Sequence, residues 1–205
     1  MYIPKYFKVE NVDEVWDFVQ ESSFGTIVTT EQGKPIASHL PLQLSREGDT
    51  TYITGHMAYG NPQWRTFENN ENVLVMFQGP HAYISSSWYE EENVPTWNYQ
   101  ALHVYGSAII MDEEALIQDL TMLLQKHEKH RNQPVLWDNL SPQLVEKQLK
   151  GIVGFKIKVQ EIQAANKLSQ NRNEEDYQNI VTQLYEEKDL TAQQLAQLME
   201  SKRKK

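Results

Sequence analysis

The residues best suited to binding chemistry lie in the stretch 51–64, TYITGHMAYGNPQW. Its first four residues are β-branched or aromatic and predict the end of a strand. The Asn61-Pro62 pair predicts a helix start, because asparagine is a good cap and proline fits the first turn. Backbone N–H groups at a helix start attract anions. With Thr54 and His56 nearby, the stretch is therefore either an anion site or an ordinary strand-to-helix connection.

Ser38 and His39 form a second candidate pair, inside a strand that is otherwise apolar. Prolines 35 and 41 flank them, which indicates an edge or mouth position in a sheet. They are either a surface pair or part of a ligand-lining wall. A Ser-His-acid hydrolase would need a G-x-S-x-G turn around its nucleophile, and this segment has none.

The histidines do not predict a metal site. His127 and His130 are three residues apart in KHEKH, one position too close for the H-E-x-x-H zinc motif. The basic residues beside them favour a solvated helix end. The chain has no cysteine, so a zinc site would need histidines and carboxylates from distant segments.

Two further segments carry polar or aromatic groups that could contact a ligand. The segment 167–172, KLSQNR, has two cations and three more polar side chains. It could hold a phosphate or the polar edge of a planar ligand, or it could be a loop that caps a helix. Trp97 and Tyr99 are suited either to a core or subunit interface or to a ring-stacking wall.

The hydrophobic pattern around these segments predicts strands in hairpin order with inserted helices. The predicted strands, seven in all, are 26–30, 35–44, 51–55, 72–78, 81–88, 97–111 and 152–159. The predicted helices are 11–25, 61–67, 112–130, 141–151, 174–187 and 192–202, with Thr191 expected to cap the last. This order implies a mainly β, antiparallel barrel with peripheral helices rather than a Rossmann sheet. We expect a barrel domain over residues 1–172 and a helical extension over 173–205.

Composition narrows the function classes. The chain has 205 residues and a formal net charge of −9, which argues against a broad surface that tracks nucleic-acid phosphates. It has no apolar run of membrane-spanning length, and its first residues lack the apolar core of a signal peptide. We therefore expect a cytoplasmic protein without membrane contact.

Taken together, four segments resemble those of PaiB-type proteins in the flavin-binding split-barrel superfamily. They are SHLP (38–41), GHMAYGNPQW (55–64), VPTWNYQALHVYG (94–106) and KLSQNR (167–172). They occur in the family's order and span most of the chain. The resemblance implies a homodimer of six-stranded antiparallel barrels with FMN between the subunits. It also implies negative regulation of sporulation and of extracellular protease genes.

The resemblance also assigns roles to particular residues of this chain. Those expected to flank the flavin ring are Ser38, His39 and Leu40. Those expected around the phosphate are Thr54, Gly55, His56 and Asn61. Those expected to close the site, from the same or the second subunit, are Lys167, Gln170, Asn171 and Arg172. The resemblance implies that related oxidases hold the phosphate with several cations, whereas this chain offers only Arg65 and one histidine, His56, in and next to the stretch 51–64.

The leading hypothesis is a transcriptional repressor on an FMN-binding barrel. One alternative is a flavin-dependent reductase or oxidase, in which FMN would do the redox chemistry. Another is a haem-binding split barrel with His39, His56 or His103 as axial ligand. Direct DNA binding has no basic recognition helix to support it, because the last two predicted helices are acidic up to the terminal KRKK.

Overall fold

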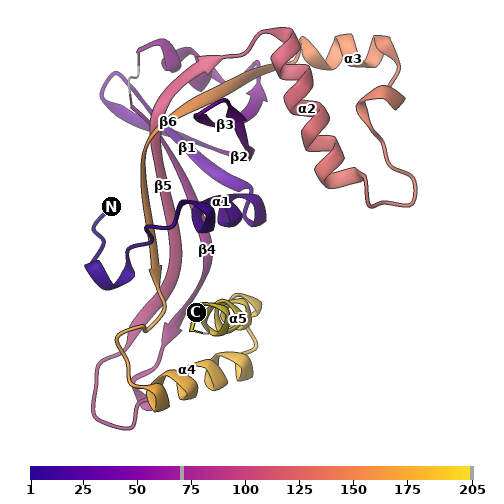
Figure 1. The fold of residues 1–205 in the computed structure, drawn as a ribbon. Coiled ribbons are helices and arrows are strands. Elements are labelled where there is room, and N and C mark those ends of the chain that lie inside the picture. Colours follow the sequence, from indigo (N-terminus) through magenta and orange to yellow (C-terminus); the bar gives the residue numbers. More distant parts are fainter. Residues whose placement is uncertain (70–71, 204–205) are drawn as a thin grey trace. The chain divides into compact units, whose positions relative to one another are not determined.

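The computed structural model describes residues 1–69 and 72–203, and its strands form a closed antiparallel barrel in the order β1-β2-β3-β6-β5-β4 (Figure 1). The strands are β1 (Phe24–Glu31), β2 (Lys34–Glu47), β3 (Thr50–Ala58), β4 (Val73–Ile84), β5 (Thr96–Ile110) and β6 (Ile152–Lys167). The fold class expected from sequence, a mainly β split barrel with peripheral helices, is confirmed.

The predicted count of seven strands is wrong by one. Gly79-Pro80 was expected to be a turn, but β4 runs straight through it. Buried positions alternate as Val73, Val75 and Phe77 before the pair and as Ala82 and Ile84 after it. The pair therefore changes which face of the strand is buried without ending the strand, as irregularities at glycine and proline do.

The α-helices are α1 (Val12–Glu21), α2 (Glu113–Glu128), α3 (Pro142–Leu149), α4 (Glu174–Glu186) and α5 (Leu190–Arg203). Short 3-10 helices are η1 (Lys5–Phe7), η2 (Pro62–Asn69), η3 (Ser86–Trp88) and η4 (Trp137–Asn139). The helix predicted at Asn61-Pro62 is thus the 3-10 helix η2. In the described part of the chain, no helix has the length and apolar character needed to cross a membrane.

Most helix starts follow their sequence signals. Asn11 accepts a hydrogen bond from the backbone N–H of Asp13 (3.0 Å), and Asp112 accepts one from that of Ala115 (2.9 Å). The cap predicted at Thr191 is wrong. Asp189 accepts the backbone N–H of Thr191 (3.0 Å). An acidic cap two residues earlier therefore starts α5 at Leu190.

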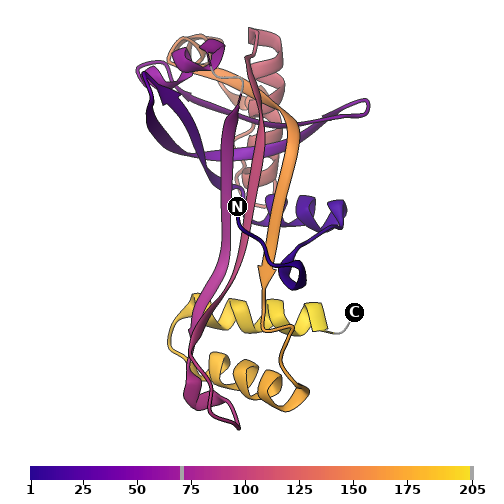
Figure 2. The same ribbon diagram turned by 90° about the vertical axis from the view of Figure 1, so that its left-hand side faces the viewer.

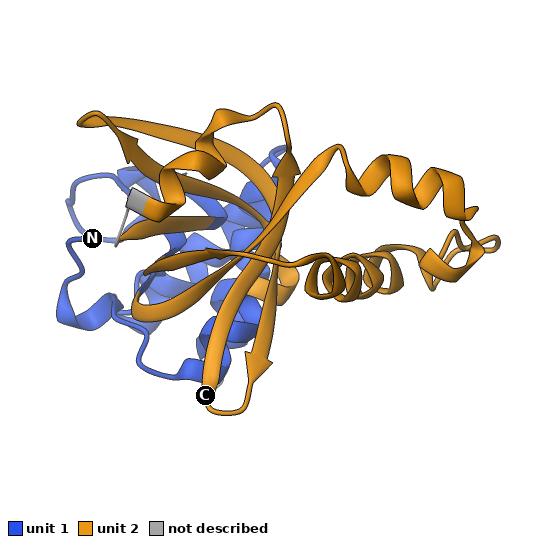
Figure 3. Ribbon diagram, turned by 90° about the horizontal axis from the view of Figure 1, so that it is seen from above, with its two compact units in different colours: residues 1–18, 78–103, 163–205 blue, residues 19–77, 104–162 orange. Residues whose placement is uncertain are grey.

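The chain divides into two compact units, coloured separately in Figure 3. Unit 1 comprises residues 1–18, 78–103 and 163–205, and unit 2 comprises 19–77 and 104–162. In unit 1, α4 and α5 lie side by side (Figures 1 and 2) and pack on Ala82, Ile84 and Tyr89. In unit 2, the core contains Ile27, Leu42, Ile53, Phe155 and Ile157. The domain boundary expected at residue 172 stays a prediction.

Gly106 of β5 lies where the backbone of β6 comes very close. A Cβ atom at this position would be 2.0 Å from the carbonyl oxygen of Lys158. We expect Gly106→Ala to lower the free energy of unfolding by about 3 kcal/mol, because backbone must shift to relieve the overlap. Urea unfolding monitored by circular dichroism measures the change.

Gly60→Ala is the matched control, because a Cβ at Gly60 meets no atom within 4 Å. We expect it to change the free energy of unfolding by less than about 0.5 kcal/mol. Equal stability of the two variants would contradict the close approach of β6 to β5.

Candidate functional site

The register of β2, β3 and β6 determines which predicted site residues face the barrel interior. Gly55 pairs with Leu42 on one side and with Phe155 on the other, and all three are buried. Neighbouring side chains on a strand point to opposite faces. Thr54 and His56 therefore lie on the outer face of the sheet, where α2 packs against β3.

Thr54 does not offer its hydroxyl to an open anion site. It donates a hydrogen bond to Oδ1 of Asp119 on α2, at 2.5 Å. Gln43, the strand neighbour of Thr54, donates to the same oxygen (3.1 Å) and to the Asp119 carbonyl (3.0 Å). Asp119 is only 2% exposed, and its Oδ2 has no hydrogen-bond partner within the described residues.

Burial shifts both ionisable groups of this cluster toward their neutral forms. Burial raises the pKa of Asp119, and the opposing influences of Thr54, His56 and Gln43 are smaller. Burial also lowers the pKa of His56, against the smaller attraction of Asp119. A buried carboxyl group and an uncharged imidazole are poor partners for a phosphate dianion, and the phosphate role expected for Thr54 and His56 stays a prediction.

Sequence reasoning missed Asp119, although a signal was present. Asp119 occurs among Leu116, Leu120 and Leu123, on the side of α2 that the leucine spacing marks as apolar. A carboxylate at such a position needs buried hydrogen-bond donors. Gln43 on β2 and Thr54 on β3 are such donors, and they are neighbours across the two strands. The sequence alone did not predict this because it does not give the register between β2 and β3.

Ser38 and Asn61, by contrast, are brought together at the start of η2. Asn61 donates from Nδ2 to the Ser38 hydroxyl (2.8 Å) and accepts the backbone N–H of Gln63 (3.0 Å). The predicted cap is therefore formed, and it occupies one of the N–H groups expected to bind an anion. The Ser38 hydroxyl can still donate to a ligand, since it accepts the Asn61 bond.

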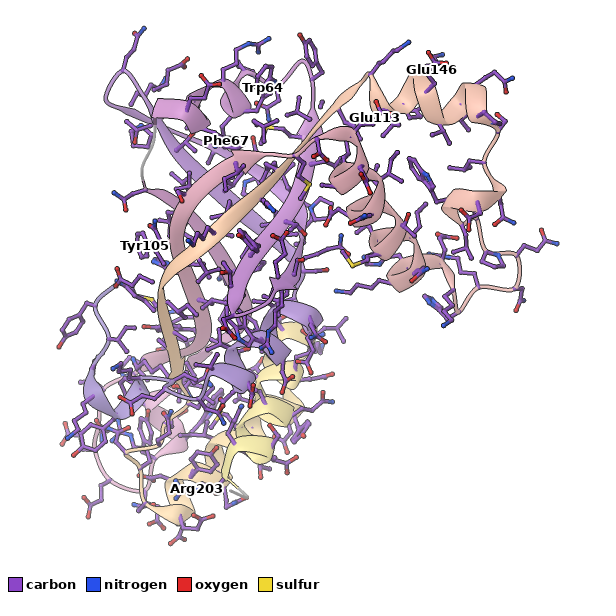
Figure 4. The ribbon with its side chains drawn as sticks, turned by 45° about the horizontal axis from the view of Figure 1, so that its top comes forward. Trp64, Phe67, Tyr105, Glu113, Glu146 and Arg203 are labelled. Carbon is purple, nitrogen blue, oxygen red and sulfur yellow. The ribbon has the colours of Figure 1, made fainter. Side chains whose placement is uncertain are left out.

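Gln63 is a buried residue that anchors η2 to the barrel. Its Nε2 group lies within hydrogen-bonding distance of the Ile27 carbonyl (3.1 Å), Thr29 Oγ1 (3.2 Å) and the Ile36 carbonyl (3.2 Å). These contacts fix η2 over β1 and β2. The next residues are the half-buried Trp64 (Figure 4) and the exposed Arg65, whose guanidinium lies 4.3 Å from the indole centroid.

His39 faces away from the barrel interior, whereas Ser38 and Leu40 face toward it. His39 pairs with Thr26, and Thr26 Oγ1 lies 2.9 Å from His39 Nδ1. Neighbouring side chains on this side of β2, β1 and β4 are half-buried or exposed. We call this surface the β1 face; it consists of Thr26, Val28, Ala37, His39, Leu74 and Met76. Its largely apolar side chains suit a planar ring or a protein surface.

The remaining predicted site residues belong to unit 1, where Lys167 is the last residue of β6 and the other three lie in the loop that follows. Lys167 donates to Thr96 Oγ1 (2.5 Å), and burial followed by the charge of Arg172 lowers its pKa. Arg172 lies over the Tyr89 ring, 4.4 Å from its centroid. Gln170 is used locally, because its side chain bonds to the Leu168 N–H and to a backbone carbonyl. Asn171 is exposed.

None of these groups forms a metal site. No cluster of three or more His, Asp or Glu side chains within residues 1–69 and 72–203 is arranged to hold a metal ion. The candidate groups in unit 2 are therefore hydrogen-bonding side chains and the β1 face, and those in unit 1 include the cations Lys167 and Arg172. These groups fit a flavin in part: the β1 face suits the ring, and Lys167 and Arg172 suit an anion.

A family model described as "Putative FMN-binding domain" matches residues 1–161. A Bacillus subtilis (strain 168) protein, "Protease synthase and sporulation protein PAI 2", is 68% identical over 205 residues, covering 100% of this chain and 99% of the relative. This chain belongs to the PaiB-type family of FMN-binding proteins. The family expected from the sequence motifs, and FMN as the family's cofactor, are thereby confirmed.

More distant relatives occur in fungi. An uncharacterised protein of Emericella nidulans is 25% identical over 225 residues, covering 89% of each chain. Two solved structures share the fold. They are the flavocytochrome Anf3 from Azotobacter vinelandii (TM-score 0.63, 86% of this chain and 78% of that one) and the FAD and heme binding protein from Mycobacterium smegmatis (TM-score 0.60, 82% and 78%). Both are 14% identical and therefore show the fold alone.

The Asp119 cluster predicts a particular dependence of stability on pH. Because the pKa of Asp119 is raised in the folded protein, the folded state holds this proton more tightly than the unfolded state. Stability from this group is therefore greatest below the unfolded pKa and is lost as pH rises through the folded pKa. Asp119→Asn keeps an oxygen that accepts from Thr54 and Gln43 but does not titrate. We expect the stability of this variant relative to wild type to increase as pH rises across that range.

Urea unfolding at a series of pH values from 4 upward measures this difference. Asp138→Asn, at an exposed position, is the control and should keep a constant offset from wild type. A constant offset for Asp119→Asn as well would show that this carboxyl group has an ordinary pKa.

Proposed function

We propose that the protein is a PaiB-type negative regulator of sporulation and protease genes that acts in the cytoplasm and responds to bound FMN. The observation that carries this proposal is the 68% identity over the whole chain to the Bacillus subtilis protein named for protease synthesis and sporulation. Membership of the FMN-binding family supports the ligand.

We propose that FMN lies between two subunits of a homodimer. In unit 2, Ser38, His39, Leu40 and Asn61 are retained as ring-side residues, since Ser38 and Asn61 offer hydrogen bonds and His39 lies on the β1 face. We propose that Lys167, Asn171 and Arg172 of the second subunit contact the phosphate. Thr54 and His56 are left out because they face the Asp119 carboxyl group. When bound, FMN supplies a redox-active ring whose occupancy or oxidation state a regulator can sense.

We also propose that the protein acts as a homodimer through the β1 face. Val28, Leu74 and Met76 leave apolar surface half-buried on this side of the sheet. A second copy of the chain would cover it and gain roughly 25 cal/mol for each Å² of apolar surface removed from water.

Regulation is proposed to be indirect rather than through a recognition helix. Two of the four basic residues at the end of the chain are already engaged in unit 1. Lys202 pairs with Glu14, and Arg203, labelled on α5 in Figure 4, pairs with Glu174 at 2.7 Å. Together with the net charge of −9, this disfavours α5 as a DNA-binding element. The reductase, oxidase and haem alternatives are supported only by fold likeness, which does not determine chemistry.

The FMN proposal predicts that the positive charges of Lys167 and Arg172 strengthen FMN binding. We expect the protein to bind FMN, and Lys167→Gln combined with Arg172→Gln to weaken binding at least about tenfold, because each charged hydrogen bond is worth about 1.5–3 kcal/mol. Quenching of FMN fluorescence on titration measures the affinity.

The control for this experiment removes two exposed charges elsewhere, Lys129→Gln with Lys188→Gln, and should leave FMN affinity within about twofold. No binding by the wild-type protein would remove the FMN-response proposal. Equal weakening by both double variants would remove the assignment of Lys167 and Arg172.

The dimer proposal predicts that a charge on the β1 face separates the subunits. We expect wild type to have twice the 23.9 kDa chain mass, and Met76→Glu to shift it to a single chain mass. Light scattering coupled to size exclusion measures this. Met122→Glu, at a 44% exposed position on α2, is matched in chemistry and should stay dimeric. A monomeric wild type, or a dimeric Met76→Glu, would contradict the assigned interface.

A further inference from the structure

The loop between Lys167 and Arg172 contains a residue in an unusual backbone conformation. Ser169 has a φ of +58°, in the left-handed region that residues with a side chain seldom adopt. It is also buried, with 4% of its surface exposed. Such a conformation persists where surrounding contacts hold it, and it is commonest at functional sites. The contacts of Ser169 therefore decide how firmly this loop is held.

Asn98 of β5 anchors the Ser169 side chain. Nδ2 of Asn98 donates to Ser169 Oγ at 2.9 Å, and the Ser169 hydroxyl donates back to Asn98 Oδ1 at 3.3 Å. Asn98 is fully buried, and its Nδ2 also lies 3.7 Å from Met199 Sδ on α5. Both ends of this buried amide are engaged, which fixes its orientation. Asn98 is thus a rigid support for Ser169 within unit 1.

Ser169 in turn fixes the backbone of Arg172. The N–H of Arg172 donates to the Ser169 carbonyl at 3.0 Å. The other cation is held by the same strand, because Lys167 Nζ donates to Thr96 Oγ1 at 2.5 Å. Thr96 and Asn98 are two residues apart in β5, so they lie on one face of the strand. One strand therefore holds the loop at two points.

These contacts keep two positive charges near each other. Burial, followed by the charge of Arg172, lowers the pKa of Lys167. Like charges held together repel, and an anion bound beside both relieves the repulsion. A loop that is already fixed also loses less conformational freedom when its ligand binds. The arrangement is therefore suited to an anion, and its precision depends on the anchors in β5.

We propose that Asn98 is a positioning residue for the flavin phosphate, which acts through Ser169 to hold Arg172 beside the second cation of the loop. This inference rests on the proposed function, in which Lys167 and Arg172 of the second subunit contact the phosphate of FMN. Asn98 has no exposed surface, so it acts on the ligand only through the loop. The segment 94–106 then contributes to phosphate binding through a buried amide rather than through its aromatic rings.

A comparison of FMN with riboflavin isolates the phosphate, because riboflavin has the same ring and ribityl chain without it. Asn98→Ala and Ser169→Gly each remove the anchoring contact, and glycine keeps the left-handed conformation accessible. We expect each variant to weaken FMN binding about fivefold or more and to leave riboflavin affinity within about twofold of wild type. Fluorescence titration of the full chain measures both affinities. The absorbance spectrum of bound FMN should be unchanged, because the ring site is intact.

Tyr177→Phe is the matched control. It removes another buried hydrogen bond of unit 1, from Tyr177 Oη to the Met199 carbonyl at 2.8 Å. It should lower the unfolding temperature, as Asn98→Ala does, without changing the affinity for FMN. The double variant Asn98→Ala with Ser169→Gly should weaken FMN binding no more than the stronger single variant, because both changes remove the same contact.

The outcomes separate this inference from the proposed function. No FMN binding by the wild-type protein would remove both. FMN binding that Asn98→Ala and Ser169→Gly leave unchanged, or that Tyr177→Phe weakens equally, would overturn the role of Asn98 alone. Equal weakening of FMN and riboflavin would also overturn it, because the loss would not concern the phosphate. Should Asn98→Ala not fold, Ser169→Gly decides the question by itself.

Discussion

Backbone pairing between β2, β3 and β6 is the constraint on which the rest of unit 2 depends. Leu42, Gly55 and Phe155 meet at one level of the barrel. A Cβ at Gly55 would lie 2.9 Å from Leu42 and 3.3 Å from Phe155, so the glycine lets both large side chains fill the interior. Once this register is fixed, the alternation of side chains along β3 places Thr54 and His56 on the other face of the sheet.

The outward position of Thr54 and His56 places both beside Asp119, to which Thr54 donates a hydrogen bond. Asp119 receives hydrogen bonds from Gln43 and Thr54 and so joins α2 to two strands. Loss of one partner from such a buried network leaves an unsatisfied polar group and is costly. Gln63 has a comparable role for η2 on β1 and β2. Polar side chains in this barrel thus hold helices onto the sheet.

Much of the fold could be predicted from the sequence, because strands and helix starts depend on local patterns. Caps at Asn11 and Asp112 and the hairpin pairings of β1 with β2 and of β2 with β3 follow from residues near one another in the chain. The turn predicted at Gly79-Pro80 is wrong because glycine and proline also occur at irregularities inside strands, and β4 continues through this pair. Asp119 could not be assigned a role because its donors lie 65 and 76 residues away in the chain. The predicted site residues were identified by motif, but the face on which each lies depends on register.

The ion pair between Lys202 and Glu14 joins positions near opposite ends of the chain within unit 1. Proteins are made from the N-terminus, and compact parts fold as soon as their residues are available. Unit 2 ends at residue 162, so all of its segments have been synthesised before α4 and α5 begin to emerge from the ribosome. Glu14, which also accepts a hydrogen bond from Asn166, can therefore form its ion pair with Lys202 only after all of unit 2 has been synthesised.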